Sequence, residues 1–388
     1  MNTYLIRFSV LIAALLLNLS VRAQNDALVI EKNAEGRVIP ITLEGFTGEA
    51  ESAIRFDLEV QGFEVVSSDR AQYQVRGSNN GSLTGQVTDR VSRAVVLPAT
   101  AYNGGTTRSQ AHAFTADVIE KITGKRGISQ SKIACKVDYG THAELFVADY
   151  DGYNAKPVTS DGALLTAPTW QPGKRVLYYT TYKMGNPDII AQDLSTGART
   201  VIARYSGLNT SPNLSPDGKR LAMILSKGGS PDLYVASADG TNLKQLTHSK
   251  DDESSPTWSP DGRRICFVST IGSRRALFVI NADGGEPVRL RTDGVLNPSE
   301  PDWSPDGKTI VFTSQMGGFS ICKIPSEGGT ATVLSEGEDP CFAGNSRTVI
   351  FTRRSNGKRS LSLLDVNTKR VKDIHQVSGR CSQPTWAR

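Results

Sequence analysis

Short apolar runs separated by turn residues alternate through the second half of the chain, and one phrase returns among them. It combines a proline, a tryptophan or other large apolar residue two positions later, and in its fullest form a Ser-Pro-Asp-Gly turn. Its copies begin at Pro168, Pro212, Pro256, Pro301, Pro340 and Pro384. The period of roughly 40–45 residues, filled by β-prone runs, predicts the blades of a β-propeller.

Each unit contains four predicted strands. The Pro-x-Trp strand comes first and is expected to be innermost, and Ser-Pro-Asp-Gly fits a type I turn after it. Two β-rich runs follow, as at 264–269 and 277–280, and a short run such as 244–247 ends the unit. We expect the recurring large residues to pack between blades. They stand at positions 170, 214, 258, 303, 342 and 386.

The two ends of the repeat complement each other. The last Pro-x-Trp strand, 384–386, has no outer strands after it, whereas the runs 132–136, 144–148 and 156–159 have no inner strand before them. Residues 131–388 are therefore predicted to form a mainly β, six-bladed propeller that the C-terminal strand closes, which removes free sheet edges at the seam. Solenoid stacking, the alternative, would leave both ends exposed.

The N-terminal part shows no repeat. Residues 1–23 have the pattern of a cleaved signal peptide, with Arg7 before an apolar stretch that is too short to span a membrane. Residues 24–126 are predicted to form a small α/β domain with helices near 49–61 and 108–123. Its strands are expected near 37–43, 63–67, 72–76, 83–88 and 91–97.

Composition narrows the function classes. There are 44 Lys+Arg and 39 Asp+Glu, so the formal net charge is +5. This mild excess does not indicate nucleic-acid binding, which would need a concentrated basic face. The five cysteines form no Cys-x-x-Cys pair, and the four histidines, His112 among them, occupy unrelated repeat positions typical of solvated residues. No Gly-x-Ser-x-Gly elbow occurs. We therefore expect no catalytic residues, no metal and no cofactor.

Several motifs resemble the TolB family of periplasmic propeller proteins. They are Val118-Ile-Glu-Lys-Ile-Thr-Gly124 leading into 131–134, the stretch Val147-Ala-Asp-Tyr-Asp-Gly-Tyr-Asn154, and the Trp-Ser-Pro-Asp-Gly repeats. The resemblance implies a non-enzymatic periplasmic scaffold. It would link a Pal-type, peptidoglycan-associated lipoprotein to a TolA-type inner-membrane protein during envelope constriction at cell division. The chain departs from the family in a shorter N-terminal domain and in a fifth repeat without Trp or Pro-Asp-Gly.

The candidate partner-binding residues lie in the loops that enter the innermost strands. By resemblance, the lipoprotein-binding positions fall on Leu208, Ser211 and Ser254. The entering loops also carry acidic residues, whereas the turns that leave these strands are basic, as at Lys219-Arg220 and Arg263-Arg264. The acidic residues are Asp251, Asp252, Glu253, Glu300 and those of 336–339. Ordinary solvated loops are the alternative interpretation of both groups.

Two further alternatives stay open. The resemblance implies that Leu28, Val29 and Ile30 belong to a docking segment for the TolA-type partner, added as a strand to the partner's sheet. The same segment could instead be the first strand of the small domain. The rival function is an exported propeller enzyme or carbohydrate-binding protein that uses the central funnel.

Overall fold

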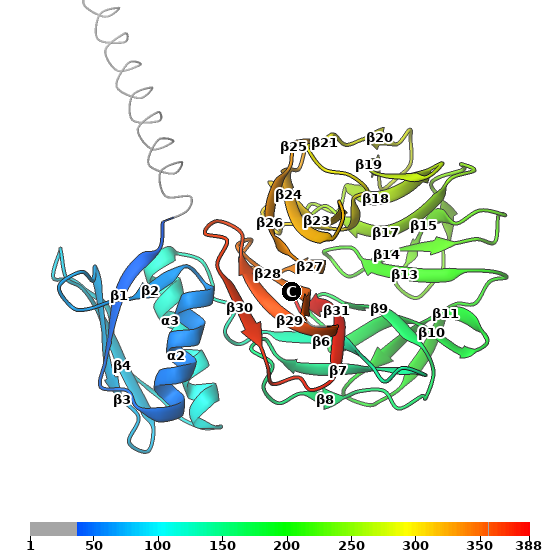
Figure 1. Cartoon of the computed structure of the whole chain (residues 1–388). Helices are drawn as coiled ribbons and strands as arrows, with labels where there is room; N and C mark the ends of the chain where they lie inside the picture. The colour runs from blue at the N-terminus through cyan, green and yellow to red at the C-terminus, as the bar shows by residue number, and fades with distance from the viewer. Residues whose placement is uncertain (1–36, 356) are drawn as a thin grey trace, which may run out of the picture.

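The N-terminal domain is a five-stranded sheet with two helices on one face (Figure 1). The computed structural model describes residues 37–355 and 357–388, so the predicted signal peptide and Leu28, Val29 and Ile30 lie outside the described residues. The strands run in the order β2-β1-β3-β4-β5, and β1 is parallel to both of its neighbours. In chain order the elements are β1 (Ile39–Glu44), α2 (Gly48–Val60), β2 (Phe63–Val65), β3 (Tyr73–Ser78), β4 (Leu83–Asp89), β5 (Val95–Tyr102) and α3 (Thr107–Thr123).

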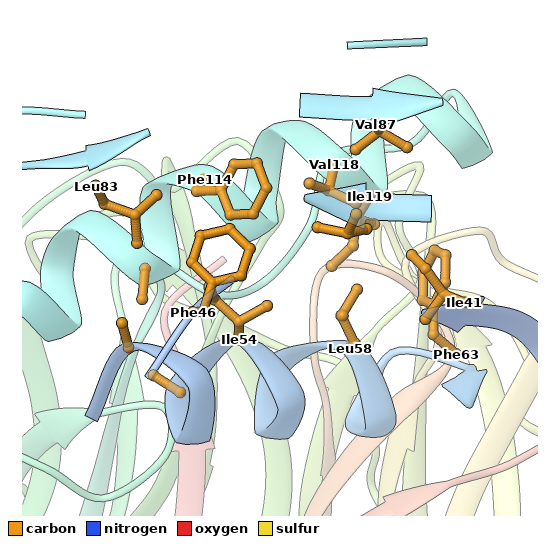
Figure 2. Close-up of a cluster of buried hydrophobic side chains, with 14 of the residues drawn as sticks. Ile41, Phe46, Ile54, Leu58, Phe63, Leu83, Val87, Phe114, Val118 and Ile119 are labelled. Carbon is orange, nitrogen blue, oxygen red and sulfur yellow. The ribbon is translucent and has the colours of Figure 1, made fainter. Parts of the chain in front are cut away.

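Apolar side chains of the two helices fill the space above the sheet (Figure 2). Ile54 and Leu58 from α2 meet Phe114 and Val118 from α3, and all four are buried. The N-cap of helix α3 is Thr106, whose side chain accepts a hydrogen bond from Ser109 N, and its C-cap is Gly124 in the left-handed conformation. Both helices were predicted correctly.

One predicted strand starts later than expected. Residues 91–94 form a turn rather than the start of the strand predicted at 91–97, so β5 begins at Val95. The Asp89 carboxylate accepts hydrogen bonds from Val91 N at 2.8 Å and Ser92 N at 3.1 Å, and Arg93 has a φ of 61°. This local side-chain capping outweighs the β propensity of Val91.

Six four-stranded sheets form the propeller, as predicted. Blade 1 contains β9 (Leu165–Trp170), β10 (Val176–Met184), β11 (Asn186–Asp193) and β12 (Arg199–Ala203). Blade 2 contains β13 (Asn209–Leu214), β14 (Arg220–Leu225), β15 (Asp232–Ser237) and β16 (Lys244–Gln245). Blade 3 contains β17 (Asp252–Trp258), β18 (Arg264–Ile271), β19 (Arg274–Asn281) and β20 (Val288–Arg289).

The remaining blades follow the same plan. Blade 4 contains β22 (Ser299–Trp303), β23 (Thr309–Gln315), β24 (Phe319–Pro325) and β26 (Thr332–Glu336). Blade 5 contains β27 (Glu338–Phe342), β28 (Thr348–Ser355), β29 (Lys358–Asp365) and β30 (Val371–Ile374). A two-stranded ribbon of β21 (Thr292–Asp293) and β25 (Gly329–Thr330) joins the outer parts of blades 3 and 4.

Blade 6 closes the ring by combining the last strand with three early ones. It contains β31 (Arg380–Trp386), β6 (Lys132–Asp138), β7 (Ala143–Asp149) and β8 (Lys156–Pro157). The strand β31 is antiparallel to β6, with Trp386 opposite Ile133 and Arg380 opposite Asp138. The predicted closure by the C-terminal strand is confirmed.

The repeated turn is held by its own serine and aspartate. In blade 3, Ser259 Oγ donates to Asp261 Oδ1 at 2.6 Å and accepts from Arg264 N at 2.9 Å, while Asp261 Oδ1 accepts from Arg263 N at 3.0 Å. In blade 5 the Asn345 side chain replaces the aspartate and accepts from Arg347 N at 3.0 Å. The degenerate fifth repeat therefore keeps its turn.

The tryptophans join neighbouring blades, as predicted. Trp258 is buried, and its Nε1 donates to the Asn213 carbonyl of the preceding blade at 3.0 Å. Arg220, which follows the turn of blade 2, lies over the Trp258 ring at 4.7 Å. Arg264 lies over Trp303 in the same way, at 4.9 Å.

The N-terminal domain docks against blades 5 and 6 (Figure 1). Thr348 Oγ1 donates to the Val60 carbonyl at 3.0 Å, and Arg370 pairs with Glu64 at 3.0 Å. Between the domains, His112 from α3 lies between two carboxylates. Its Nδ1 is 2.8 Å from Asp57 Oδ2 of α2, and its Nε2 is 3.2 Å from Asp151 Oδ2 of the propeller. His112 is 5% exposed, so the expectation of a solvated histidine was wrong for this residue.

Candidate functional site

The innermost strands define two faces of the propeller and a channel between them. Each innermost strand begins on one face, here called the entering face, and ends on the other, the leaving face. Two cavities lie along the channel, of about 240 Å³ on the entering side and about 540 Å³ on the leaving side. They share Thr169, Asn213, Asp302, Cys341 and Thr385 as lining residues. They are therefore the two ends of one passage.

The residue before the repeated proline is left-handed in all six blades. At each of these positions the pairing with the second strand shifts by a β-bulge, as between Ser254 and Thr257. All six residues line the entering cavity. They are Ala167, Ser211, Ser255, Glu300, Asp339 and Gln383, with φ between 50° and 56°. Because the feature repeats in every blade, it belongs to the blade architecture and not to one strained site.

Ser211 and Glu300 are therefore brought together at the mouth of the channel. Glu300 Oε2 accepts hydrogen bonds from Thr313 Oγ1 at 2.7 Å and from Asp339 N at 3.1 Å. Burial and the neighbouring Glu300 charge raise the pKa of Asp339 to about 7. Ser255 and Gln383 were missed by sequence reasoning, although their place before the repeated proline was a usable signal. Asp339 was expected as one of the acidic residues of an entering loop.

Leu208 and Ser254 lie near this mouth without lining the cavity. Leu208 is half-buried against the apolar contact between blades 2 and 3, and its N–H donates to Ser226 Oγ at 2.7 Å. Ser254 is half-buried in β17 and pairs with Val268. The channel-lining serine of this blade is the next residue, Ser255.

The acidic loop before β17 presents only part of its charge to solvent. Asp252 is exposed and Asp251 is half-buried. Glu253 is 4% exposed and accepts hydrogen bonds from Ser249 Oγ at 2.8 Å and Thr247 Oγ1 at 2.9 Å. Burial raises the pKa of Glu253 to about 7, and the nearby Asp232 adds to this shift. Glu253 thus holds the loop together from inside.

The other acidic entering loop, residues 336–339, also exposes only part of its negative charge to solvent. Glu338 is buried and pairs with Arg354 at 2.7 Å and Arg359 at 3.2 Å. The outward acidic charge of the expected patch therefore reduces to Asp251, Asp252 and Glu336. It does not dominate the face.

Exposed apolar side chains gather on the same face. Seven of the exposed large apolar residues in the described part of the propeller stand in its entering loops and hairpin tips. They are Tyr139, Leu164, Tyr182, Met184, Ile271, Leu296 and Met316. The other three, Val201, Val288 and Val333, lie in the outermost strands. Apolar groups at loop tips, beside polar ones, are typical of protein-binding surfaces.

Metal-ligand clusters, membrane-spanning helices and the state of the cysteines were assessed for the residues that the structure describes. Across 37–355 and 357–388, no group of three or more His, Cys, Asp or Glu side chains could hold a metal ion. The helices among these residues are too short or too polar to cross a membrane. The five cysteines, all within the described residues, are free thiols.

Comparisons with known proteins point in one direction. A family model described as the TolB beta propeller domain matches residues 119–388. Tol-Pal system protein TolB from Haemophilus ducreyi is 39% identical over 141 residues, which are 35% of this chain and 33% of that protein. TolB from Actinobacillus pleuropneumoniae serotype 5b is 38% identical over 128 residues, or 32% and 30% of the two chains. Both alignments span about a third of the relative's length.

A solved structure extends the likeness to both domains. The crystal structure of TolB from Acinetobacter baumannii matches with a TM-score of 0.81 at 23% identity, covering 90% of this chain and 97% of that one. At this identity the likeness establishes the fold.

Proposed function

Since this chain belongs to the TolB family, we propose that it is a non-enzymatic scaffold of the Tol-Pal system. In this role it resides in the periplasm and links a Pal-type, peptidoglycan-associated lipoprotein to a TolA-type inner-membrane protein. The link would serve envelope integrity and outer-membrane constriction at cell division. The matched relatives are named as Tol-Pal system proteins, which supports membership in the same system.

One observation of the structure carries the proposal that the lipoprotein docks on the entering face. The exposed apolar loop tips of the propeller gather there, around a funnel lined by small polar and acidic side chains. In this arrangement Ser211 and Glu300 form the funnel wall, Leu208 and Ser254 support its rim, and Asp251 and Asp252 contact the partner. Glu253 keeps their loop in shape.

The docking proposal is tested with the soluble domain of the lipoprotein. We expect Ser211→Trp to abolish binding, because the large ring would fill the entering cavity. We expect Asp251→Ser with Asp252→Ser to accelerate dissociation several-fold. Arg263→Ser is the control, since this exposed side chain lies on the leaving face and forms no ion pair with another described residue. Surface plasmon resonance would measure all three, and weakened binding by Arg263→Ser alone would place the partner on the opposite face.

The segment around Leu28, Val29 and Ile30 is proposed to dock the TolA-type protein. The proposal rests on the resemblance of Val29-Ile30-Glu31 to the end of the family's docking segment and on its apolar, β-prone character. Deleting residues 24–30 should abolish binding to the TolA-type domain and leave lipoprotein binding unchanged. Retained TolA binding would show that these residues are not the docking segment.

A further inference from the structure

Six β-hairpins form the outer rim of the entering face, and we call them the hairpin crown. Each joins the second and third strands of one blade. The crown comprises residues 138–142, 182–186, 226–230, 271–275, 315–319, and 353–355 with 357–359. It stands farther from the ring axis than the funnel, because the innermost strands lie between them.

The charge of the crown is almost entirely positive. It contains eight Lys and Arg residues and one carboxylate, Asp138. The basic residues are Lys183, Lys227, Arg274, Arg275, Arg353, Arg354, Lys358 and Arg359. The Asp138 Oδ1 atom accepts a hydrogen bond from Gly140 N at 2.7 Å, so this carboxylate is engaged in its own turn.

Several of the basic groups cover carboxylates that are buried beneath them. Lys183 pairs with Asp161 at 2.8 Å and Arg354 with Glu338 at 2.7 Å. The Lys183 and Arg354 side chains are 52% and 46% exposed, whereas those of Asp161 and Glu338 are 5% and 9% exposed. A partner approaching from solvent therefore meets the cations first.

Blade 3 carries the clearest charge. Arg274 and Arg275 are exposed, and neither forms an ion pair with another described residue. They stand in the same hairpin as Ile271, which is 46% exposed. In blade 1, Met184, 68% exposed, stands beside Lys183. Cationic and apolar groups therefore stand side by side in the hairpins of blades 1 and 3.

The centre of the face has the opposite sign. Glu300 and Asp339 line the entering cavity, and Asp251 and Asp252 lie in an inner loop. The face is thus concentric, with a basic and apolar rim around an acidic funnel. A complementary protein surface would carry carboxylates around its edge, apolar groups between them, and a neutral or basic centre.

We infer that the hairpin crown steers and seats the acidic edge of the protein that docks on the entering face. The inference rests on the proposed function for the identity of that protein, the Pal-type lipoprotein. Long-range attraction between the crown and this acidic edge raises the association rate, whereas the funnel residues act after contact. Apolar tips at several points of the rim favour a protein partner over an anionic lipid surface or a nucleic acid.

The test reverses charge in the blade 3 hairpin. Arg274→Glu with Arg275→Glu should slow association with the soluble lipoprotein domain about tenfold at low salt and flatten its dependence on salt. The matched control, Lys219→Glu with Arg263→Glu, makes the same change in charge on the leaving face and should leave the rate near wild type. Lys358→Glu changes the charge of the crown in blade 5. Any effect of this substitution on folding would be independent of the effect of the blade 3 variant. Circular dichroism and thermal unfolding establish that each variant is folded.

Each outcome separates the two ideas. If the wild-type protein fails to bind the lipoprotein, the proposed function is wrong and the inference falls with it. If the wild type binds and the crown variants associate at its rate, or the leaving-face pair slows association equally, the inference alone is wrong. Vesicles that contain anionic phospholipid serve as a third ligand. Crown-dependent binding to them, with unchanged lipoprotein association, would assign the crown to a membrane surface and overturn the inference.

Discussion

The ring seam and the domain interface are the two joints of this molecule, and they are built from different interactions. The seam is a β-ladder between β31 and β6, with Trp386 and Cys381 buried behind it. The interface depends on charges that are buried together. Asp57, His112, Arg108 and Asp151 meet there, and each side chain is 10% exposed or less. The two joints touch at Tyr150, whose ring lies 6.1 Å from that of Trp386 and whose hydroxyl donates to Asp57.

The two joints should respond differently to perturbation. The stability of a β-ladder backed by apolar packing depends little on pH, but the ladder cannot form when one of its strands is removed. A buried charge cluster stabilises only while every member keeps its partner and its protonation state.

The largest effect is expected at the seam. Deleting residues 382–388 removes most of β31, the innermost strand of blade 6, exposes the core face of the blade and leaves most of the β6 edge unpaired. We expect this to lower the free energy of unfolding by at least about 4 kcal/mol. Urea unfolding would measure the loss. Arg388→Ala separates the contribution of the Arg388 ion pair with Asp302. Thermal unfolding of the truncated protein within about a degree or two of wild type would exclude ring closure by this strand.

Breaking the charge cluster should have the next largest effect. Asp151→Asn removes the buried carboxylate that Arg108 and His112 share and leaves His112 with Asp57 alone, so we expect a loss of about 3 kcal/mol in the free energy of unfolding. Arg370→Ala is the control at the same interface. Its ion pair with Glu64 is about half exposed, so its loss should be under about 1 kcal/mol. Equal losses of stability in the Asp151→Asn and Arg370→Ala variants would mean that burial adds nothing to the stabilising effect of the cluster.

The cluster should also make stability depend on pH. Burial alone would lower the pKa of His112, but the adjacent carboxylates of Asp151 and Asp57 outweigh burial and raise the pKa to about 9. Arg108 and Tyr150 are the other titratable groups at the cluster. The contribution of His112 to the free energy of unfolding is fully present below its unfolded pKa of about 6.5, and it is lost as the pH rises through 9. Between pH 7 and about pH 9.5, the free energy of unfolding of the wild type should fall by about 2 kcal/mol more than that of the His112→Gln variant. Parallel pH profiles in urea unfolding would contradict this assignment.

The smallest effect is expected where charges join blades at the surface. Arg264 lies over Trp303 and pairs with Glu327 at 3.0 Å, but Glu327 is largely exposed. Arg264→Met should cost about 1 kcal/mol or less, and Arg263→Met should cost nothing measurable. Thermal shifts of the two variants compare the paired arginine with its unpaired neighbour. A larger loss for Arg263→Met would reverse the assignment.

The seam was predictable from the sequence, and the interface was not. Repeated proline and tryptophan positions mark equivalent strands. The unmatched strand at 384–386 could therefore be assigned to the blade that begins at residue 132 and lacks an innermost strand. His112 stands on α3 one turn from Arg108, but its partner Asp151 lies in a blade turn far along the chain. No periodicity connects the two.

The candidate site was predictable in position and less so in detail. The entering loops were located because they precede the repeated proline. A left-handed residue and a β-bulge then interrupt strand alternation, so Ser255 rather than Ser254 lines the channel. The burial of Glu253 depends on Ser249 and Thr247 folding around it, which charge counting along the loop cannot reveal.

The position of the N-terminal domain also determines how the molecule would carry tension. The chain leaves α3, crosses residues 124–131 and enters β6, the strand that closes the ring with β31. A pull on the N-terminal domain would therefore reach the propeller at its seam. The contacts of α2 and α3 with blades 5 and 6 lie in parallel with that connection and share the load. Under such a pull, the buried cluster of Asp57, His112 and Asp151 would bear part of the force that would otherwise act on the pairing of β6 with β31.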